Sequence, residues 1–161
     1  MELCFYDEKY QELIMQYQIT EEQLRFTGSP LESIELVNED PDRYAILVME
    51  EGKLVTFFNL HIAEGVKPYS SNPNAILLRT FSTDIRFLGR GYAKQSLNLL
   101  PAFVRQHFTD INEIVLGVNV QNEIAQSLYK KCGYVDEGER RKGKKGELII
   151  MSTYLKEYAT Q

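Results

Sequence analysis

The chain has 161 residues, 43% of them hydrophobic and 25% charged, which is ordinary for one globular domain, and we expect that domain to span residues 1–161. No apolar run approaches the roughly 18 residues of a membrane span, and the first residues lack the basic start of a secretory signal. Cys4 and Cys132 have no metal-type spacing. We therefore expect a cytoplasmic protein with free thiols, no metal and no membrane partner.

Charge is distributed unevenly along a chain whose net charge is −5. Residues 1–50 carry a net charge of −9, and residues 51–161 carry +4. The overall acidity disfavours nucleic acid as the main partner. The basic part has the charge to neutralise phosphates. The acidic part suits a cationic small molecule such as a polyamine, although these acids are more simply understood as solvating the surfaces of helices.

The first half of the chain predicts a strand, two helices and a hairpin. Asp7 is a suitable N-cap for the first helix, and Ser29 followed by Pro30 begins the second. Glu50–Gly52 forms the turn between two strands of high β-propensity. The predicted elements are a strand at Glu2–Tyr6, a helix at Glu8–Gln16, a helix from Ser29 to Asn38, and strands at Arg43–Met49 and Lys53–Ile62.

The second half alternates strands and helices and ends in a hairpin. Its elements are a strand at Ala75–Thr83, a helix at Gly91–His107, a strand at Glu113–Val120, a helix that begins at Asn122, and strands at Tyr134–Glu139 and Glu147–Leu155. Pro101 should kink the first of these helices. The predicted hairpin tip, Arg140–Gly146, carries five bases. The order of elements predicts an α/β (α+β) fold with a mixed sheet covered by helices.

The most informative segment is Arg86–Ala93, between a buried strand and a helix. Gly89 and Gly91 let the backbone approach a ligand closely, because glycine has no Cβ. The amides of the helix N-terminus point outward there, and the helix dipole adds partial positive charge. Arg86 and Arg90 add full charges, so the turn is suited to a pyrophosphate.

Two well-known nucleotide-binding turns fit this segment poorly. A P-loop would need Gly-Lys-Ser/Thr, which the segment lacks. A dinucleotide-binding turn would need a third glycine at the position of Lys94. Taken alone, the segment is also compatible with a plain strand-to-helix turn.

Two segments together carry a family resemblance. Arg-x-x-Gly-x-Gly at Arg86–Gly91 resembles the pyrophosphate signature of the GNAT superfamily of acetyl-CoA-dependent N-acetyltransferases. Residues 122–134 resemble the family's Asn-x-x-Ala-x-x-Leu-Tyr-x-Lys-x-Gly-Phe segment, with Tyr134 in place of Phe. The resemblance covers roughly Tyr44 to Leu155, and the first 40 residues match only in general layout.

The resemblance implies a GNAT fold: a mixed, mostly antiparallel sheet of about seven strands flanked by four helices. The strand at Ala75–Thr83 would be bulged and splayed from the strand at Glu113–Val120, and the pantetheine arm would lie between them. It also implies transfer of an acetyl group from acetyl-CoA to a primary amine by direct attack on the thioester, and a homodimer through the last strands.

The resemblance assigns site residues as well. The backbone of Phe81, Ser82 and Thr83 would bind pantetheine, and Asn122 would contact the cofactor arm. Tyr129 would protonate the departing thiolate. The pyrophosphate would be held by Arg86 and by the amides of Leu88, Gly89, Arg90, Gly91, Tyr92 and Ala93. Leu88 departs from the family, in which many members carry a polar residue.

The general base and the acceptor remain open in the sequence. Glu64, Asp84 and His61 are candidates for the base. Glu21, Glu22 and Phe26 would form an acidic, aromatic pocket for a polyamine. The alternatives are an aminoglycoside, an amino acid, or a peptide or protein amine as acceptor, or a catalytically silent module that senses CoA.

Overall fold

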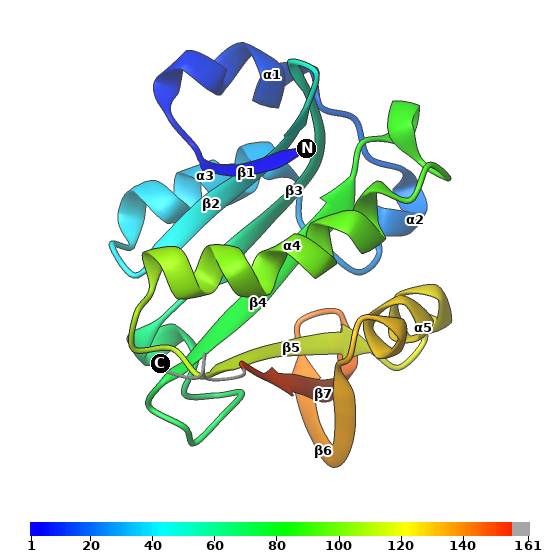
Figure 1. Ribbon diagram of the computed structural model, residues 1–161. Coiled ribbons are helices and arrows are strands. Elements are labelled where there is room, and N and C mark those ends of the chain that lie inside the picture. Colours follow the sequence, from blue (N-terminus) through cyan, green and yellow to red (C-terminus); the bar gives the residue numbers. More distant parts are fainter. Residues whose placement is uncertain (156–161) are drawn as a thin grey trace.

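The computed structural model describes residues 1–155, which contain a seven-stranded sheet in the order β1-β2-β3-β4-β5-β7-β6 (Figure 1). Neighbouring strands are antiparallel except β4 and β5, which are parallel. The expected mixed, mostly antiparallel sheet is confirmed. The strands are β1 (Glu2–Phe5), β2 (Arg43–Glu50), β3 (Lys53–His61), β4 (Ala75–Thr83), β5 (Glu113–Asn119), β6 (Val135–Gly143) and β7 (Gly146–Tyr154).

Helices cover both faces of the sheet (Figure 1). The long helix α4 and the shorter α5 pack on one face around a cluster that includes Phe58, Leu100 and Tyr129. Helices α1 and α3 pack on the other face, against Leu47 and Phe57. The helices are α1 (Gln11–Gln16), α2 (Glu21–Leu24), α3 (Pro30–Glu39), α4 (Tyr92–His107) and α5 (Glu123–Lys131), with 3₁₀ turns at Glu8–Tyr10, Ala63–Gly65 and Ile85–Phe87.

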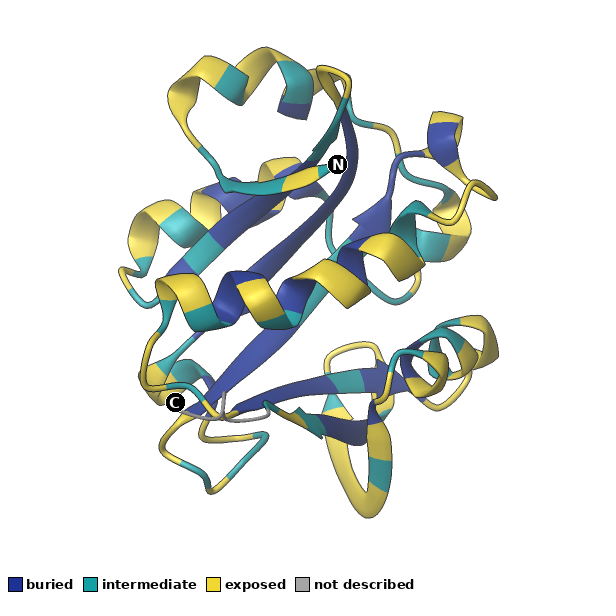
Figure 2. Ribbon diagram, in the orientation of Figure 1, coloured by how far each residue is buried: buried dark blue, intermediate teal, exposed yellow. Residues whose placement is uncertain are grey.

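The hydrophobic core lies in the central strands, which are buried along most of their length (Figure 2). Along β3, Phe58 and Leu60 face α4, whereas Phe57 packs on the side of α1 and α3. This alternation follows from the period of two in an extended chain. It places Asn59 and His61 on the same face as Phe57, as the sequence predicted.

Strand β4 is bulged at Thr80, which has a φ of 58°. Arg79 pairs with Asn59 and Ser82 pairs with Phe57, so β4 has one more residue than β3 across this step. A threonine in the left-handed region costs on the order of 1–3 kcal/mol, and it turns the strand. The predicted bulge in the fourth strand is confirmed.

Strands β4 and β5 pair only over Ala75–Leu78 and Glu113–Leu116. Beyond these residues the two strands diverge, toward the ends at which α4 and α5 begin (Figure 1). Backbone groups of β4 beyond Leu78 therefore have no partner strand on that side. The predicted splay is confirmed, and it provides a slot of the kind that an extended ligand can enter as an added strand.

Two local features differ from the sequence predictions. The short helix α2 was not predicted, although Thr20 caps it by accepting a hydrogen bond from the amide of Gln23. The predicted hairpin tip at Arg140–Gly146 is wrong, because β6 continues to Gly143 and β7 begins at Gly146. Arg140, Arg141 and Lys142 lie on the exposed edge strand β6, where charged residues are common, and Lys144 and Lys145 form the turn. Pro101 lies inside α4, as the sequence predicted.

A close backbone approach holds His61 in place and gives a stability prediction. A Cβ added at Gly65 would overlap the His61 ring, whereas a Cβ at Gly28 would make ordinary contacts at 3.6 Å. We expect Gly65→Ala to lower the free energy of unfolding by about 1–3 kcal/mol, as overpacking does. Urea unfolding of Gly65→Ala beside the control Gly28→Ala measures this. Equal stability of the two variants would contradict the predicted overlap.

Candidate functional site

The glycine turn ends in an open helix N-terminus. Gly89 and Gly91 have φ angles of 77° and 79°, which glycine adopts without strain. Gly91 is the N-cap of α4 and offers no side chain, so no side-chain cap bonds the first amides of the helix. The guanidinium of Arg90 lies 5.7 Å from the centre of the Phe87 ring, beside this turn. The predicted pyrophosphate residues thus lie together around outward-facing amides and positive charge.

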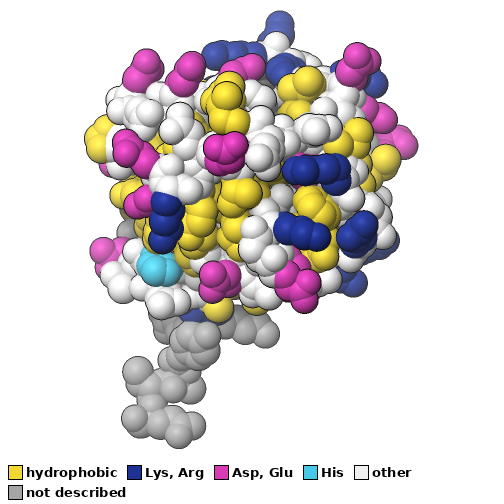
Figure 3. All heavy atoms as spheres, turned by 90° about the horizontal axis from the view of Figure 1, so that it is seen from above, with side chains coloured by type: hydrophobic (Ala, Val, Ile, Leu, Met, Phe, Trp, Pro, Cys, Tyr) yellow, Lys and Arg dark blue, Asp and Glu magenta, His cyan; other side chains and the backbone are white. Residues whose placement is uncertain are grey.

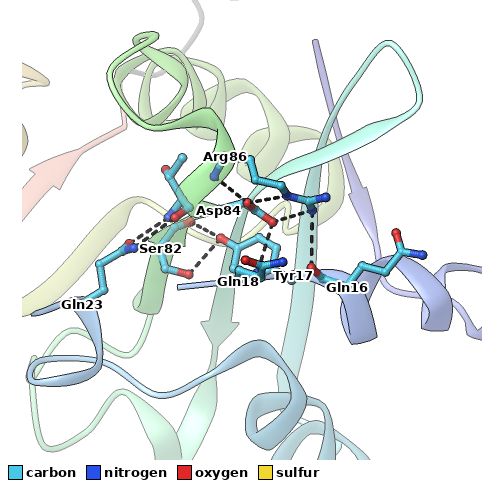
Figure 4. Close-up of polar contacts among 8 residues, drawn as sticks. Gln16, Tyr17, Gln18, Gln23, Ser82, Asp84 and Arg86 are labelled. Carbon is cyan, nitrogen blue, oxygen red and sulfur yellow. Dashed lines mark hydrogen bonds and ion pairs between the residues drawn. The ribbon is translucent and has the colours of Figure 1, made fainter. Parts of the chain in front are cut away.

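A buried carboxylate holds the start of this turn (Figure 4). Asp84 is 0% exposed and accepts hydrogen bonds from Arg86 Nε at 3.0 Å, from Arg86 Nη2 at 2.8 Å and from the Arg86 amide at 2.9 Å. Its Oδ2 also accepts from the amide of Gln18 at 3.2 Å. Burial alone raises the pKa of Asp84, but the hydrogen bonds and the charge of Arg86 outweigh it, so the pKa lies below its usual value.

This ion pair gives Arg86 a structural role besides the one expected from the sequence. Two of its guanidinium nitrogens are directed at Asp84, and Nη2 also reaches the carbonyl of Gln16 at 3.4 Å. The side chain is still 47% exposed. Arg86 therefore orders the turn through Asp84 and adds positive charge to its surface.

The end of β4 is partly occupied by the N-terminal segment (Figure 4). Tyr17 Oη donates to the carbonyl of Ser82 at 2.7 Å. The Gln23 amide bonds both backbone groups of Thr83 at 3.1 Å. Of the three residues predicted to bind pantetheine, Phe81 is the one whose backbone no described side chain engages.

Tyr129 lies in the wall of the slot. It is 8% exposed, and its ring lies 6.2 Å from Phe81 and 5.8 Å from Tyr134 in edge-to-face contacts. Burial, together with nearby Cys132, raises the pKa of the Tyr129 hydroxyl well above its ordinary value. The phenol is therefore protonated at neutral pH, as a proton donor must be. Asn122 begins the same helix, and its Oδ1 accepts from the Ala125 amide at 3.2 Å.

None of the three candidate bases is free at the slot. Asp84 is buried against Arg86. His61 pairs with Leu77, in the part of the sheet where β4 and β5 are still joined, and its Nε2 lies 2.8 Å from Asp40. Glu64 is exposed and pairs with Lys67. Each of the three is therefore paired with another residue or lies away from the slot, and none is assigned as the general base.

The candidate polyamine residues lie in α2 and directly after it. Glu21 and Glu22 are exposed in the first turn of α2, and no described residue forms an ion pair with them. Lys145 donates to the carbonyls of Leu24 and Thr27, which joins α2 to the β6–β7 turn. Seen from above, acidic and basic side chains are interspersed and neither covers the surface (Figure 3).

Sequence reasoning missed two groups of residues. Tyr17 and Gln23 bond the end of β4 across more than 50 positions of sequence, which no local pattern reveals. Arg43, Asn59 and Arg79 are polar residues in or at the start of strands that are largely buried. Such residues are seldom buried without a partner or a ligand, and that was the available signal.

A cavity of about 220 Å³ lies elsewhere, between the 69–72 loop and strands β5, β6 and β7. Its lining includes Glu113, Glu137 and Tyr154, and none of the predicted site residues. Among residues 1–155, no three His, Cys, Asp or Glu side chains are grouped as a metal site requires. No helix in the same range is long and apolar enough to cross a membrane.

Comparison with known proteins identifies the family. The profile of the Acetyltransferase (GNAT) family matches residues 6–134. The uncharacterized N-acetyltransferase YbbJ of Bacillus subtilis (strain 168) is 38% identical over 154 residues, which are 95% of this chain and 96% of that protein.

Solved structures share the fold at low sequence identity. The aminoglycoside acetyltransferase AAC(6′)-Ib with paromomycin and acetyl-CoA has a TM-score of 0.77 at 13% identity, covering 94% of this chain and 92% of its own. Spermidine N-acetyltransferase from Vibrio cholerae with CoA and spermine has a TM-score of 0.71 at 18% identity, covering 96% and 95%. The bulged fourth strand, the open N-terminus of α4 and the family match lead to one conclusion: this chain belongs to the GNAT family and is an acetyl-CoA-dependent N-acetyltransferase.

Proposed function

We propose that this enzyme acetylates the primary amine of a small molecule by direct attack on the acetyl thioester. The observation that carries the proposal is the slot between β4 and β5, with the uncapped N-terminus of α4 at its mouth and Tyr129 in its wall. A pyrophosphate held at the helix N-terminus would leave an extended arm directed along β4.

In this proposal each cofactor contact has a physical role. The amides from Leu88 to Ala93 bind the pyrophosphate, and Arg90 adds charge. Phe81 offers its backbone to the pantetheine arm. Arg86 keeps the turn in shape through Asp84, and Asn122 lies at the start of α5, near the arm.

The reaction forms a C–N bond and breaks a C–S bond. The amine must first lose a proton, because an alkyl ammonium with a pKa of about 10 is mostly protonated at neutral pH. Its proton passes to solvent in the absence of an assigned base. The departing thiolate takes a proton from Tyr129, which then recovers one, since a buried phenolate is unfavourable. Such acid catalysis contributes roughly 10²–10⁴ in rate.

Two acceptor classes have support in the chain. A polyamine would use the carboxylates of Glu21 and Glu22 with the ring of Phe26, and one fold neighbour is a spermidine N-acetyltransferase. An amine that also bears an anionic group would instead suit the buried Arg43 and its neighbour Arg79. The remaining alternatives are that the acceptor is a peptide amine or that the protein is a catalytically silent CoA sensor. The following experiments distinguish them.

The acid role predicts a kinetic effect at Tyr129. We expect Tyr129→Phe to lower kcat about tenfold or more, because the thiolate loses its proton donor, while acetyl-CoA affinity changes little. The measurement is acetyl-CoA-dependent thiol release across spermidine, spermine, lysine, aminoglycosides and short peptides. Tyr154→Phe, on an exposed residue of β7, is the matched control. An unchanged kcat in Tyr129→Phe would assign Tyr129 to packing alone.

The double variant Glu21→Gln/Glu22→Gln tests the polyamine class. If α2 binds a polyamine, the variant loses spermidine acetylation and retains acetyl-CoA binding, because the ammonium groups lose their counter-charges. Unchanged kinetics with spermidine would remove this class. Thiol release and calorimetric titration with acetyl-CoA measure the two quantities separately.

The Asp84 ion pair predicts a pH-dependent loss of stability. We expect Asp84→Asn to lower the free energy of unfolding at pH 7 by about 1–2 kcal/mol, a value reduced because Arg86 is half exposed. Since the folded-state pKa of Asp84 is depressed, the wild-type contribution is complete above the unfolded pKa of about 3.9. It is lost as the pH falls through the folded-state pKa.

Unfolding curves at pH 7 and pH 3.5 measure this effect, and the difference between Asp84→Asn and wild type should be smaller at pH 3.5. Asp136→Asn is the matched control, because Asp136 pairs with Arg140 at the exposed edge strand. We also expect weaker acetyl-CoA binding in Asp84→Asn, because the turn is less ordered. If Asp84→Asn lost no more stability at pH 7 than Asp136→Asn, the special role of Asp84 would be contradicted.

A further inference from the structure

Three donor side chains meet beside the bulge, on the face of the sheet that α1 and α3 cover. Arg43 on β2 donates through Nε to Asn59 Oδ1 at 2.6 Å and through Nη2 to Thr80 Oγ1 at 3.3 Å. Arg79 on β4 pairs with Asn59 across the sheet. Because the bulge turns Thr80 to the same side as Arg79, one guanidinium spans β2, β3 and β4.

Asn59 has an unused donor. Its side chain is 0% exposed, and its Nδ2 has no hydrogen-bond partner among the described residues. The amide cannot be reversed, because Arg43 Nε requires an acceptor and only Oδ1 provides one. A buried amide donor without a partner is costly, so an acceptor from outside the chain is expected here.

The two arginines carry more positive charge than the chain compensates. Neither Arg43, which is 8% exposed, nor Arg79 forms an ion pair with a described carboxylate. Burial and the charge of Arg79 lower the pKa of Arg43 to about 10, which leaves it charged at neutral pH. The nearby carboxylate of Asp40 is directed at His61 instead.

His61 links Arg79 to Asp40 without supplying an anion. Arg79 Nη1 lies 3.4 Å from His61 Nδ1, and arginine only donates, so Nδ1 accepts and Nε2–H is directed at Asp40. Burial keeps the pKa of His61 below its ordinary value, despite Asp40, so the ring is neutral near pH 7. The chain therefore orients Arg79 and leaves its remaining donors available.

The cluster lies at the level of the sheet at which β4 parts from β5. Arg79 is the first residue of β4 beyond its pairing with β5, and Gly117 is the corresponding residue of β5. A side chain at Gly117 would meet Tyr69 and Leu148 at 3.0–3.1 Å, so this side of the slot is lined closely. Phe81 and Tyr129 lie on the opposite face, with α4 and α5. A thioester in the slot would present its carbonyl between these two faces.

We propose that the acceptor amine also bears a carboxylate, which Arg43, Arg79 and Asn59 Nδ2 bind on the α1 and α3 face beside the bulge. The inference deepens the proposed function and rests on it. Guanidinium groups bind carboxylates with short, charge-assisted hydrogen bonds. The same charges repel a polyamine, so the acceptor is an amino acid or a related amino carboxylate.

The first experiment compares acceptors that differ only in the carboxylate. Amino acids with different spacings between amine and carboxylate are each paired with the amine that lacks the carboxylate, such as lysine with 1,5-diaminopentane. We expect at least one amino acid to exceed its partner about tenfold or more in kcat/KM, as a charge-assisted hydrogen bond allows. Equal values across all pairs would overturn the proposal.

The second experiment uses variants of the cluster. Arg79→Gln should raise KM for the preferred amino acid about tenfold, leave kcat nearly unchanged, and have little effect on the amine that lacks the carboxylate. Arg79→Lys should restore part of the affinity. Lys53→Gln, which removes one charge at the far end of β3, is the matched control. Equal losses for both acceptors of a pair would overturn the proposal.

A binding readout separates this inference from the proposed function. Calorimetry on the CoA-loaded protein with the N-acetyl amino acid should show binding that Arg79→Gln weakens, even if no acceptor is turned over. Turnover of amines without any carboxylate preference would leave the proposed function in place and overturn the inference. A higher kcat/KM for 2-aminoethyl phosphate than for 3-aminopropanoate would show that the cluster prefers a phosphate to a carboxylate. That result would overturn the inference as stated.

Discussion

The parting of β4 from β5 at Leu78 and Leu116 is the constraint on which the rest of the site depends. The two strands are parallel and hydrogen-bonded at one end, and the bulge at Thr80 redirects β4 immediately afterwards. A bulge increases local twist and leaves backbone groups unpaired. Thr80 has a strained backbone at this point. The result is an unpaired strand edge inside the sheet, to which an extended ligand can hydrogen-bond.

The open edge requires that the end of β4 be fixed in another way. Asp84 fixes the end of β4, since its fully buried carboxylate accepts hydrogen bonds from Arg86 and from the Gln18 amide. Tyr17 and Gln23 add bonds to Ser82 and Thr83. The acidic N-terminal segment is thus part of the site's framework, because it holds the strand that leads into the glycine turn.

The two faces of the slot have different chemistry. The α4 and α5 face offers Phe81, Tyr129 and Tyr134, which exclude water and keep the phenols protonated. The α1 and α3 face offers Arg43 and Arg79 without a paired carboxylate among the described residues. One face is suited to a departing thiolate that needs a proton, and the other to an acceptor with negative charge. The arginines of this face come from β2 and β4, and no described acid of residues 1–50 forms an ion pair with either of them.

The sequence alone determined the order of the strands and longer helices, the glycine turn and the segment that contains Asn122 and Tyr129, because each depends on residues close together in the chain. It also predicted the splay, through the family resemblance. Tertiary structure decided the pairing of Asp84 with Arg86, the use of Tyr17 and Gln23 to secure β4, and the meeting of Arg43, Asn59 and Arg79 on one face. These contacts join separate strands and loops, and the bulge at Thr80 changes which side chains share a face. No local pattern contains that information, since it arises only when β2, β3 and β4 pair in their final register.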